Sequence, residues 1–278
     1  MNASTFRILD TLSSNIGDFL SINQLTERIK ATYGTAYYPN IYHNLQDLKN
    51  EGLLKLDRIG TSSCVKLNFQ NYLLIDILAE IEIKRKRRFL SKRTELFPFL
   101  TEMDKTLDNK CAIRSISSLN PEKNIKLNRI EFLFLLSKTP EYHNETIQLY
   151  KEMQNLQNKH NLKINSLILD ENDFYDLITS DEINPLREAL NQEINFFCPQ
   201  VFWSEIKQVA EKTEIKTIKT ETKPANISDL DLTYNLNSFG YKQFGTIHEK
   251  GNKFCIEYIT TAILLQDDAR LIEACLLY

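Results

Sequence analysis

Residues 112–137, AIRSISSLNPEKNIKLNRIEFLFLLS, contain the strongest strand signal of the chain. They predict a strand, a loop and a second strand, Ile130–Leu136, which is apolar through nearly its whole length. A short apolar run that follows a polar Lys-Leu-Asn-Arg lead-in is typical of a strand buried on both faces. We therefore expect this strand at the centre of a small sheet with helices packed against it.

The polar residues around these two strands resemble the active-site segment of the minimal nucleotidyltransferases. In that family a Gly-Ser turn is followed by Ser-Asp-x-Asp on the next strand. Here Ser117-Ser118 stand at the Gly-Ser position, and Asn128-Arg129-Ile130-Glu131 stand at the Ser-Asp-x-Asp position. The third acidic residue of such enzymes lies on a later strand, and Asn165 of the predicted strand Lys163–Leu169 occupies that place.

These differences remove the groups that the resemblance requires for catalysis. Paired carboxylates hold the Mg²⁺ ions that neutralise nucleotide phosphates, and the guanidinium of Arg129 cannot coordinate a cation. Close approach of backbone N–H groups to phosphates needs a residue without a Cβ, but no glycine occurs between Gly60 and Gly240. The resemblance therefore implies a nucleotidyltransferase-like fold with an inactive site, no metal and no cofactor. The residues of this degenerate site are Ser117, Ser118, Arg129, Glu131 and Asn165.

A further segment, Glu193–Ile206 or EINFFCPQVFWSEI, supports the same resemblance. In archaeal nucleotidyltransferase-like proteins an acidic-aromatic helix follows an (I/V)-x-(L/F)-(Y/F)-G turn, and Cys198 stands here in place of that glycine. The resemblance thus covers residues 110–207. Trp203, the single tryptophan, is expected to pack in the core. A predicted helix within 140–160 joins two strands, which implies a parallel or mixed sheet with a crossover helix.

Composition excludes several classes of protein. Gly and Pro number only seven each in 278 residues, which argues against disorder and against all-β folds rich in tight turns. No apolar run reaches membrane-spanning length, and the first twenty residues lack the pattern of a signal peptide. The five cysteines are scattered and never spaced as C-x-x-C, as expected for reduced thiols of a cytoplasmic protein.

Charge is distributed unevenly along the chain, whose net charge is −3. Residues 1–93 hold 14 Lys and Arg against 9 Asp and Glu, whereas the remaining residues hold 20 against 28. A basic first third joined to an acidic remainder indicates a nucleic-acid-binding part attached to a part with another role.

The first 69 residues predict three helices followed by two strands. Ser21 and Gln24 form the pattern of a capping box before the second helix, and Pro39 suits the first turn of the third. The stretch YPNIYHNLQDLKNEGLLKL resembles the recognition helix and first wing strand of winged helix-turn-helix regulators of the MarR and PadR kind, over residues 3–69. That resemblance implies binding of double-stranded DNA, with polar residues of the third helix in the major groove. Winged helices used only for protein contacts are the alternative.

The DNA-contacting residues implied by this resemblance lie in three places. The third helix contributes Tyr38, Asn40, Tyr42, His43, Gln46 and Lys49. The wing contributes Arg58, Thr61, Ser62, Ser63 and Lys66. The end of the next predicted helix, residues 70–90, contributes the five consecutive basic residues Lys84, Arg85, Lys86, Arg87 and Arg88, which could contact phosphates or form a solvated linker. The apolar side of this helix, within Tyr72–Ile83, predicts a homodimer, for which the middle sheet is the alternative contact.

The predicted fold class is α+β, in five parts. We expect a winged helix-turn-helix over 1–69, linking helices over 70–109, the degenerate nucleotidyltransferase-like domain over 110–207, a linker over 208–235 and a helical segment over 236–278. The second of the linking helices is predicted over Phe97–Leu107. Within the last segment Phe254–Leu265 and Asp267–Leu277 predict helices, and DDARLIEACLL resembles the tail of similar archaeal fusion proteins.

Three functions are compatible with these features. The first is a DNA-binding regulator whose middle domain serves as scaffold, dimerisation or ligand-sensing module, with room for an anionic ligand or a protein partner. The second is a divergent nucleotidyltransferase of the toxin–antitoxin or RNA- or protein-modifying type, for which Glu122, Glu131, Asp170 and Asp173 would have to form a new site. The third is a protein-only adaptor.

Overall fold

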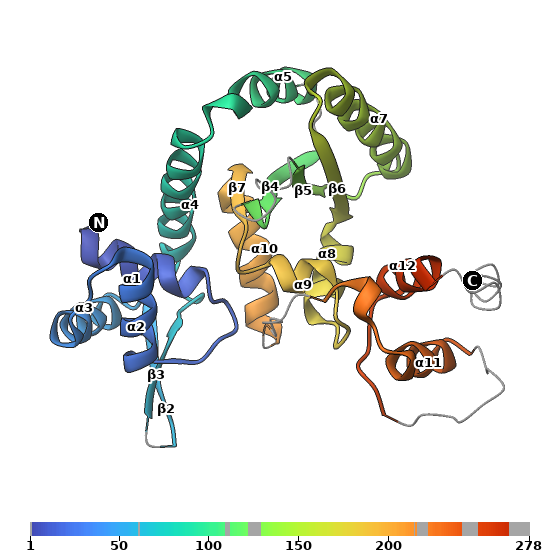
Figure 1. Ribbon diagram of the computed structural model, residues 1–278. Coiled ribbons are helices and arrows are strands. Elements are labelled where there is room, and N and C mark those ends of the chain that lie inside the picture. The colour runs from blue at the N-terminus through green and yellow to red at the C-terminus, as the bar shows by residue number, and fades with distance from the viewer. Residues whose placement is uncertain are drawn as a thin grey trace. The chain divides into compact units, whose positions relative to one another are not determined.

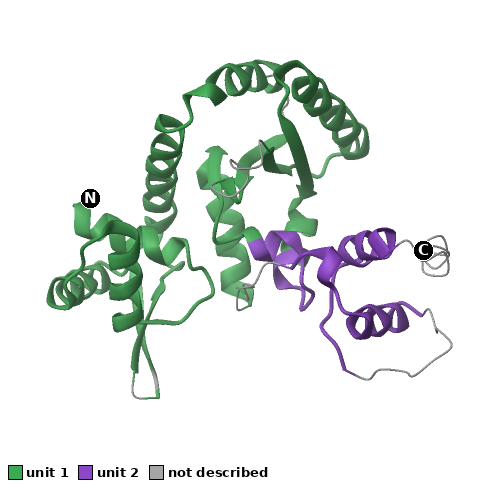
Figure 2. Ribbon diagram, viewed as in Figure 1, with its two compact units in different colours: residues 1–176, 189–215 green, residues 177–188, 216–278 purple. Residues whose placement is uncertain are grey.

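The chain folds into a mixed α+β structure with two small sheets (Figure 1). The computed structural model describes residues 2–60, 62–108, 112–121, 129–213, 215, 222–240 and 250–266. Two compact units divide the chain: unit 1 comprises 1–176 and 189–215, and unit 2 comprises 177–188 and 216–278 (Figure 2). The bounds of these two units differ from those of the five predicted parts.

Unit 1 begins with three helices, α1 (Ala3–Ser13), α2 (Ile22–Tyr33) and α3 (Tyr38–Asn50). The predicted capping box is confirmed: the Ser21 hydroxyl accepts from the Gln24 N–H, and the Gln24 side chain accepts from the Ser21 N–H. Pro39 lies in the first turn of α3, as predicted. Ile41, Leu45 and Leu48 are buried on the inner side of this helix, which leaves its outer side to solvent.

A three-stranded antiparallel sheet accompanies these helices. It has the order β1-β3-β2, formed by β1 (Leu20–Ser21), β2 (Leu54–Ile59) and β3 (Ser62–Leu67). Val65 faces Leu20 on one side and Leu56 on the other, which fixes the register around a buried residue. The turn from α3 into β2 passes through Gly52 at φ +73°, a conformation that favours glycine.

The long helix α4 (Leu74–Ser91) follows the hairpin, and the 3₁₀ turn η1 (Thr94–Leu96) leads into α5 (Phe97–Leu107), whose bounds match the prediction. The apolar side of α4 packs within the same chain, against α1, α10 (Pro199–Lys212) and β7 (Ile194–Phe197). Leu74, Leu78 and Ile81 are fully buried there. This packing removes most of the apolar surface on which the predicted dimer rested, although Tyr72 and Leu73 remain exposed.

The second sheet has four strands in the order β6-β5-β4-β7. The strands β4 (Ile113–Leu119) and β5 (Arg129–Leu136) are antiparallel, and β5 pairs in parallel with β6 (Lys163–Asp170) after the crossover helix α7 (Tyr142–His160). The predicted mixed sheet is therefore confirmed, with β5 at an internal position and buried along most of its length.

Both faces of this sheet are covered. One face forms a core with α5 and α7 that includes Phe99, Phe132, Phe134 and Met153. Helix α10 packs on β4 and β7, and its Trp203 is completely buried, as predicted. Residues Ile194–Phe197 form a strand rather than the turn suggested by the resemblance, and Cys198 then adopts φ +49°.

Unit 2 contains the end of α8 (Glu171–Thr179), most of α9 (Pro185–Ala189), the 3₁₀ turn η2 (Pro224–Asn226), α11 (Asp229–Ser238) and α12 (Ile256–Gln266). The predicted linker over 208–235 is wrong at both ends, since α10 continues to Lys212 and α11 begins at Asp229. The apolar residues Leu232 and Leu236 of α11 are buried against α12. The predicted helix over 267–277 lies outside the described residues.

Among the residues that the structure describes, no helix combines the length and the apolar character needed to cross a membrane. Cys64, Cys198 and Cys255 are free thiols. Burial raises the pKa of Cys255 to about 12.

Candidate nucleic-acid interface and cavities of unit 1

The outer side of α3 carries the residues predicted to read DNA. Tyr38, Asn40, Tyr42, His43 and Lys49 are exposed, and Gln46 is half-buried. The rings of Tyr38 and Tyr42 stack with their centroids 6.2 Å apart, so one turn of the helix presents two adjacent aromatic faces. Nδ1 of His43 lies 3.1 Å from a carboxylate oxygen of Asp47, which fixes the orientation of the imidazole.

The predicted wing is the β2–β3 hairpin. Arg58, Ser62 and Ser63 are exposed there, whereas Thr61 lies outside the described residues. Lys66 pairs with Asp57 across the hairpin and lies over the ring of Phe19, 5.6 Å from its centroid. Lys66 is therefore engaged within the sheet, and Arg58 is the exposed cation of the described part of the hairpin.

The run Lys84–Arg88 does not form one exposed basic surface, and the prediction that all five residues contact DNA is wrong for Arg85. Lys84 pairs with Glu80 at 2.6 Å, and Lys86 donates to the Phe196 carbonyl at 2.9 Å. Arg87 and Arg88 are exposed. The helical period explains this division, because residues three and four apart share a side and Arg85 lies on the buried side with Ile81 and Phe89.

Arg85 joins α1 to α4. Its guanidinium donates to the Asp10 carboxylate at 2.5 Å, to the Asp10 carbonyl at 2.7 Å and to Glu82 at 2.5 Å, and also to the hydroxyls of Ser13 and Ser14. Only 10% of the Arg85 side chain is exposed. Burial alone lowers the pKa of Arg85, but the carboxylates of Glu82 and Asp10 raise it by more, so the guanidinium stays charged.

The same polar network continues into the four-stranded sheet. Glu82 is completely buried and accepts from the Asn195 N–H at 3.2 Å. The Asn195 side chain donates in turn to the hydroxyls of Ser115 and Ser117, at 2.8 and 3.0 Å. Burial raises the pKa of Glu82. A continuous chain of hydrogen bonds thus links α1, α4, β7 and β4.

The degenerate site inferred from the resemblance is only partly assembled. Glu131 and Asn165 face each other across β5 and β6, and the Arg129 guanidinium lies 2.9 Å from the Glu131 carboxylate. The positive charge of Arg129 thus compensates the negative charge of Glu131, the single carboxylate among the five residues inferred for this site. Ser117 is buried and bonded to Asn195.

Ser118 is also buried, and it lines a void of only about 10 Å³ together with Arg129. That volume is close to the space of one water molecule.

Two of the acidic residues considered for an alternative site, Glu131 and Asp170, have structural partners. Asp170 accepts from the N–H groups of Asn172 and Asp173 at the start of α8, both at 2.8 Å, and pairs with Lys138 at 3.0 Å. Burial acts to raise the pKa of Asp170, but these N–H groups and Lys138 together lower it. Glu122 lies outside the described residues. Within the described part of the chain no group of His, Cys, Asp and Glu has the arrangement of a metal site.

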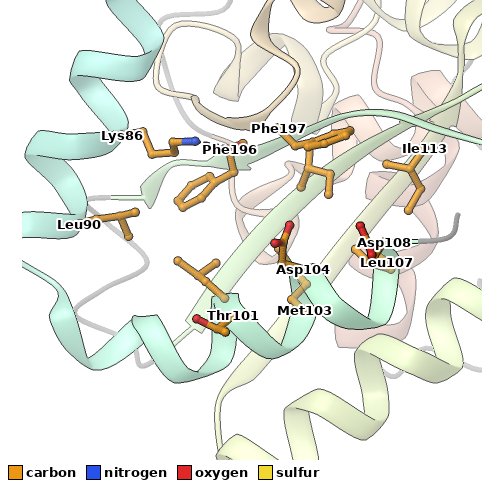
Figure 3. Close-up of a pocket in the computed structure, with 12 residues that line it drawn as sticks. Lys86, Leu90, Thr101, Met103, Asp104, Leu107, Asp108, Ile113, Phe196 and Phe197 are labelled. Atoms are coloured by element: carbon orange, nitrogen blue, oxygen red, sulfur yellow. Dashed lines mark hydrogen bonds between the residues drawn. The ribbon is translucent and has the colours of Figure 1, made fainter. Parts of the chain in front are cut away.

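An apolar cavity of about 360 Å³ lies among α4, α5, β4 and β7 (Figure 3). Leu90, Met103, Leu107, Ile113 and Phe196 supply most of its lining, and its volume is within the range of small-molecule sites. Its polar groups are those of Lys86, Thr101, Asp104 and Asp108. Burial lowers the pKa of the Lys86 amine, which already donates to a backbone carbonyl.

A larger cavity of about 490 Å³ lies among α1, α4, the residues after β4 and the residues before β7. We call it the basic cavity, because Arg85, Arg88, Lys92 and Arg93 line it, together with Asp10, Ser14, Phe89, Asn120, Pro121, Asn191, Gln192, Glu193 and Ile194. Sequence reasoning missed both cavities and also Glu193 and Asn195. The available signal was a carboxylate before β7, Glu193, and an amide within it, Asn195. The hydrogen-bond partners of Asn195 lie far away in the sequence.

Comparison with protein-family models, with curated proteins and with solved structures found no match for this chain.

Proposed function

We propose that this protein is a DNA-binding regulator and that residues 2–69 are a winged helix-turn-helix. The exposed outer side of α3 carries the proposal, because it presents side chains that read base edges on a helix whose inner side is fully packed. The antiparallel β2–β3 hairpin beside it supports the same reading, with Arg58 available for a phosphate contact. Arg87 and Arg88 extend the basic surface along α4.

The proposed role of the four-stranded sheet is a nucleotidyltransferase-like scaffold without transfer activity. The ion pair between Arg129 and Glu131 supports this role, since the guanidinium compensates the negative charge of the carboxylate and repels a divalent cation at close range. The parallel β5–β6 pair with its crossover helix supports the fold part of the proposal.

A binding selection on genomic DNA fragments, followed by fluorescence anisotropy on the selected site, tests the proposal. Affinity should fall steeply with salt because phosphate contacts release counterions. His43→Ala combined with Gln46→Ala should weaken specific binding by about 1–3 kcal/mol per lost base contact and leave non-specific binding nearly unchanged. His143→Ala combined with Gln148→Ala provides a control matched in residue type, on the exposed side of α7.

Three results would count against the proposal. Absence of any selected sequence would reject DNA reading, and a flat salt response would reject phosphate contact. Equal loss of specific and non-specific affinity in the α3 variant would reject α3 as the reading helix.

We also propose that the protein binds DNA as a homodimer, since winged helices of this kind commonly occupy paired half-sites. Tyr72, 84% exposed, and Leu73, 58% exposed, are the apolar residues left for such a contact at the start of α4. Sedimentation at a protein concentration of tens of micromolar should give the mass of a dimer. That concentration is on the order of the dissociation constants of weak specific complexes. A monomer for the native chain, or a dimer unchanged by Tyr72→Ser with Leu73→Ser, would contradict this contact.

A further inference from the structure

The apolar cavity among α4, α5, β4 and β7 leaves part of its own lining unburied. Its volume is about 360 Å³ (Figure 3). Four of its apolar side chains pack against the core of the four-stranded sheet yet are only partly buried: Leu90, Leu100, Ile113 and Phe196. Phe197, which also lines the cavity, is 44% exposed. Removal of such surface from water is favourable, so this lining favours a ligand with an apolar body.

Most polar groups of the cavity come from one side of α5. Thr101, Asp104 and Asp108 are separated by three and four positions, so the helical period places them in one row. Both carboxylates are exposed, and among the described residues neither has an ion-pair partner. Asp108 is the residue at which α5 ends, and the carbonyl groups of a last helical turn attract positive charge. This wall of the cavity therefore favours a cation.

The opposite wall carries a lysine that is already engaged. Lys86 of α4 is half-buried and donates to the Phe196 carbonyl at 2.9 Å. Figure 3 shows Lys86 and Asp108 at opposite ends of the cavity, with Asp104 between them. Two carboxylates against one ammonium group leave the described lining with an excess of negative charge. A negatively charged ligand would meet both carboxylates, whereas a positively charged one meets Lys86 only at the far end.

We propose that the apolar cavity binds a small primary amine with an aliphatic or aromatic body. The body packs among Leu90, Leu100 and Phe197, and the ammonium group donates to the carboxylates of Asp104 and Asp108. Residues four positions apart on a helix have Cβ atoms about 5–6 Å apart, so one ammonium group, which has three donors, can contact both carboxylates. A volume of about 360 Å³ is at the lower end of small-molecule sites, which fits one ring or a short alkyl chain.

Calorimetric titration of the full chain at pH 7, where alkylamines are protonated, tests the site. The probes are phenethylamine and hexylamine, the alcohols with the same bodies (phenethyl alcohol and hexanol), ethylamine and the anion hydrocinnamate. We expect at least one of the two larger amines to bind at least tenfold more tightly than its alcohol and than ethylamine. Hydrocinnamate should bind more weakly than phenethylamine, because its carboxylate meets Asp104 and Asp108.

Two sets of variants separate the charged part of the site from the apolar part. Asp104→Asn with Asp108→Asn should weaken amine binding at least tenfold and change alcohol binding by less than about threefold. Asp76→Asn with Asp173→Asn is the matched control, since both residues are exposed and outside the cavity. Phe197→Ala should weaken amine and alcohol alike, by at least threefold, whereas Phe97→Ala should weaken neither. Phe97 is 46% exposed and does not line the cavity.

Four results would overturn the proposal. They are no binding of either larger amine at millimolar concentration, alcohols that bind as tightly as their amines, tighter binding of hydrocinnamate than of phenethylamine, and amine binding that is indifferent to the Asp104 and Asp108 variant or to Phe197→Ala. Thermal unfolding of each variant shows whether a loss of binding reflects a loss of folding. The titration contains no DNA, so its outcome is independent of the proposed regulator.

Discussion

Replacement of Arg85 by methionine is expected to destabilise unit 1 strongly. The change keeps the length and the apolar stem of the side chain but leaves Asp10 and Glu82, whose side chains are 8% and 0% exposed, without their cation. Breaking a buried ion pair by removal of one partner costs about 3–5 kcal/mol. Because burial raises the pKa of Glu82, this group can take up a proton when the cation is lost, so the lower end of that range, about 3 kcal/mol, is expected.

Thermal and urea unfolding monitored by circular dichroism would measure this loss. A change of 1 kcal/mol corresponds to about 2–4 °C in Tm for a unit of this size, so Arg85→Met should lower Tm by about 6–12 °C. Arg87→Met, two positions along the same basic run, is the matched control and should change stability by less than about 0.5 kcal/mol because Arg87 is exposed. Adding Asp10→Asn and Glu82→Gln to Arg85→Met should recover part of the loss.

Two results would refute this reasoning. A loss below about 1 kcal/mol in Arg85→Met would mean that the ion pairs are not formed in solution. An equal loss in Arg87→Met would mean that the effect comes from charge or helix propensity rather than from burial. The two variants should also differ in DNA affinity, since only Arg87 is placed to contact phosphates.

Three further changes give measurable outcomes. The pKa of Glu193 is raised in the folded state, so the folded chain holds a proton that the unfolded chain releases. Stability is therefore lost as pH rises from about 4.5, by at most about 1.4 kcal/mol per pH unit for this group. Because the pKa of Glu82 is raised as well, Glu193→Gln should reduce this slope in urea unfolding without abolishing it, whereas Glu27→Gln should leave it unchanged. Cys198→Gly should raise stability by about 1 kcal/mol, because φ +49° strains a residue that has a Cβ; a loss in thermal unfolding would mean that contacts of the thiol outweigh the strain. Arg129→Asp should give no Mg²⁺-dependent transfer from labelled nucleotides, since the glycine turn and the third carboxylate remain absent; detected transfer would contradict an inactive site.

Local sequence patterns determined most of the regular structure of unit 1. The apolar run of β5, the capping box of Ser21 and Gln24 and the bounds of α5 were predicted and are confirmed. Each depends on interactions within a few residues or on a periodic apolar pattern, and such signals are present in the sequence itself.

Local patterns failed where a distant partner supplies the stability. Residues 229–235 were predicted as part of a linker, yet they belong to α11 because Leu232 and Leu236 are buried against α12. Residues Ile194–Phe197 were predicted as a turn before a helix, yet they form β7 by pairing with β4, whose sequence lies about 80 positions earlier.

The candidate sites divide in the same way. Residues of α3 were placed on its outer side from the apolar period alone, because a helix with one buried side must expose the other. Five consecutive basic residues, by contrast, have the same local sequence signal whether they face solvent or not. Glu82 lies three positions before Arg85 on the same helix, but only the packing of α1 against α4 brings Asp10 to the Arg85 guanidinium. Only the approach of the residues before β7 brings Glu193 into the lining of the basic cavity. Burial of a charge depends on partners brought together by the fold, and that information is absent from the neighbourhood of any one residue.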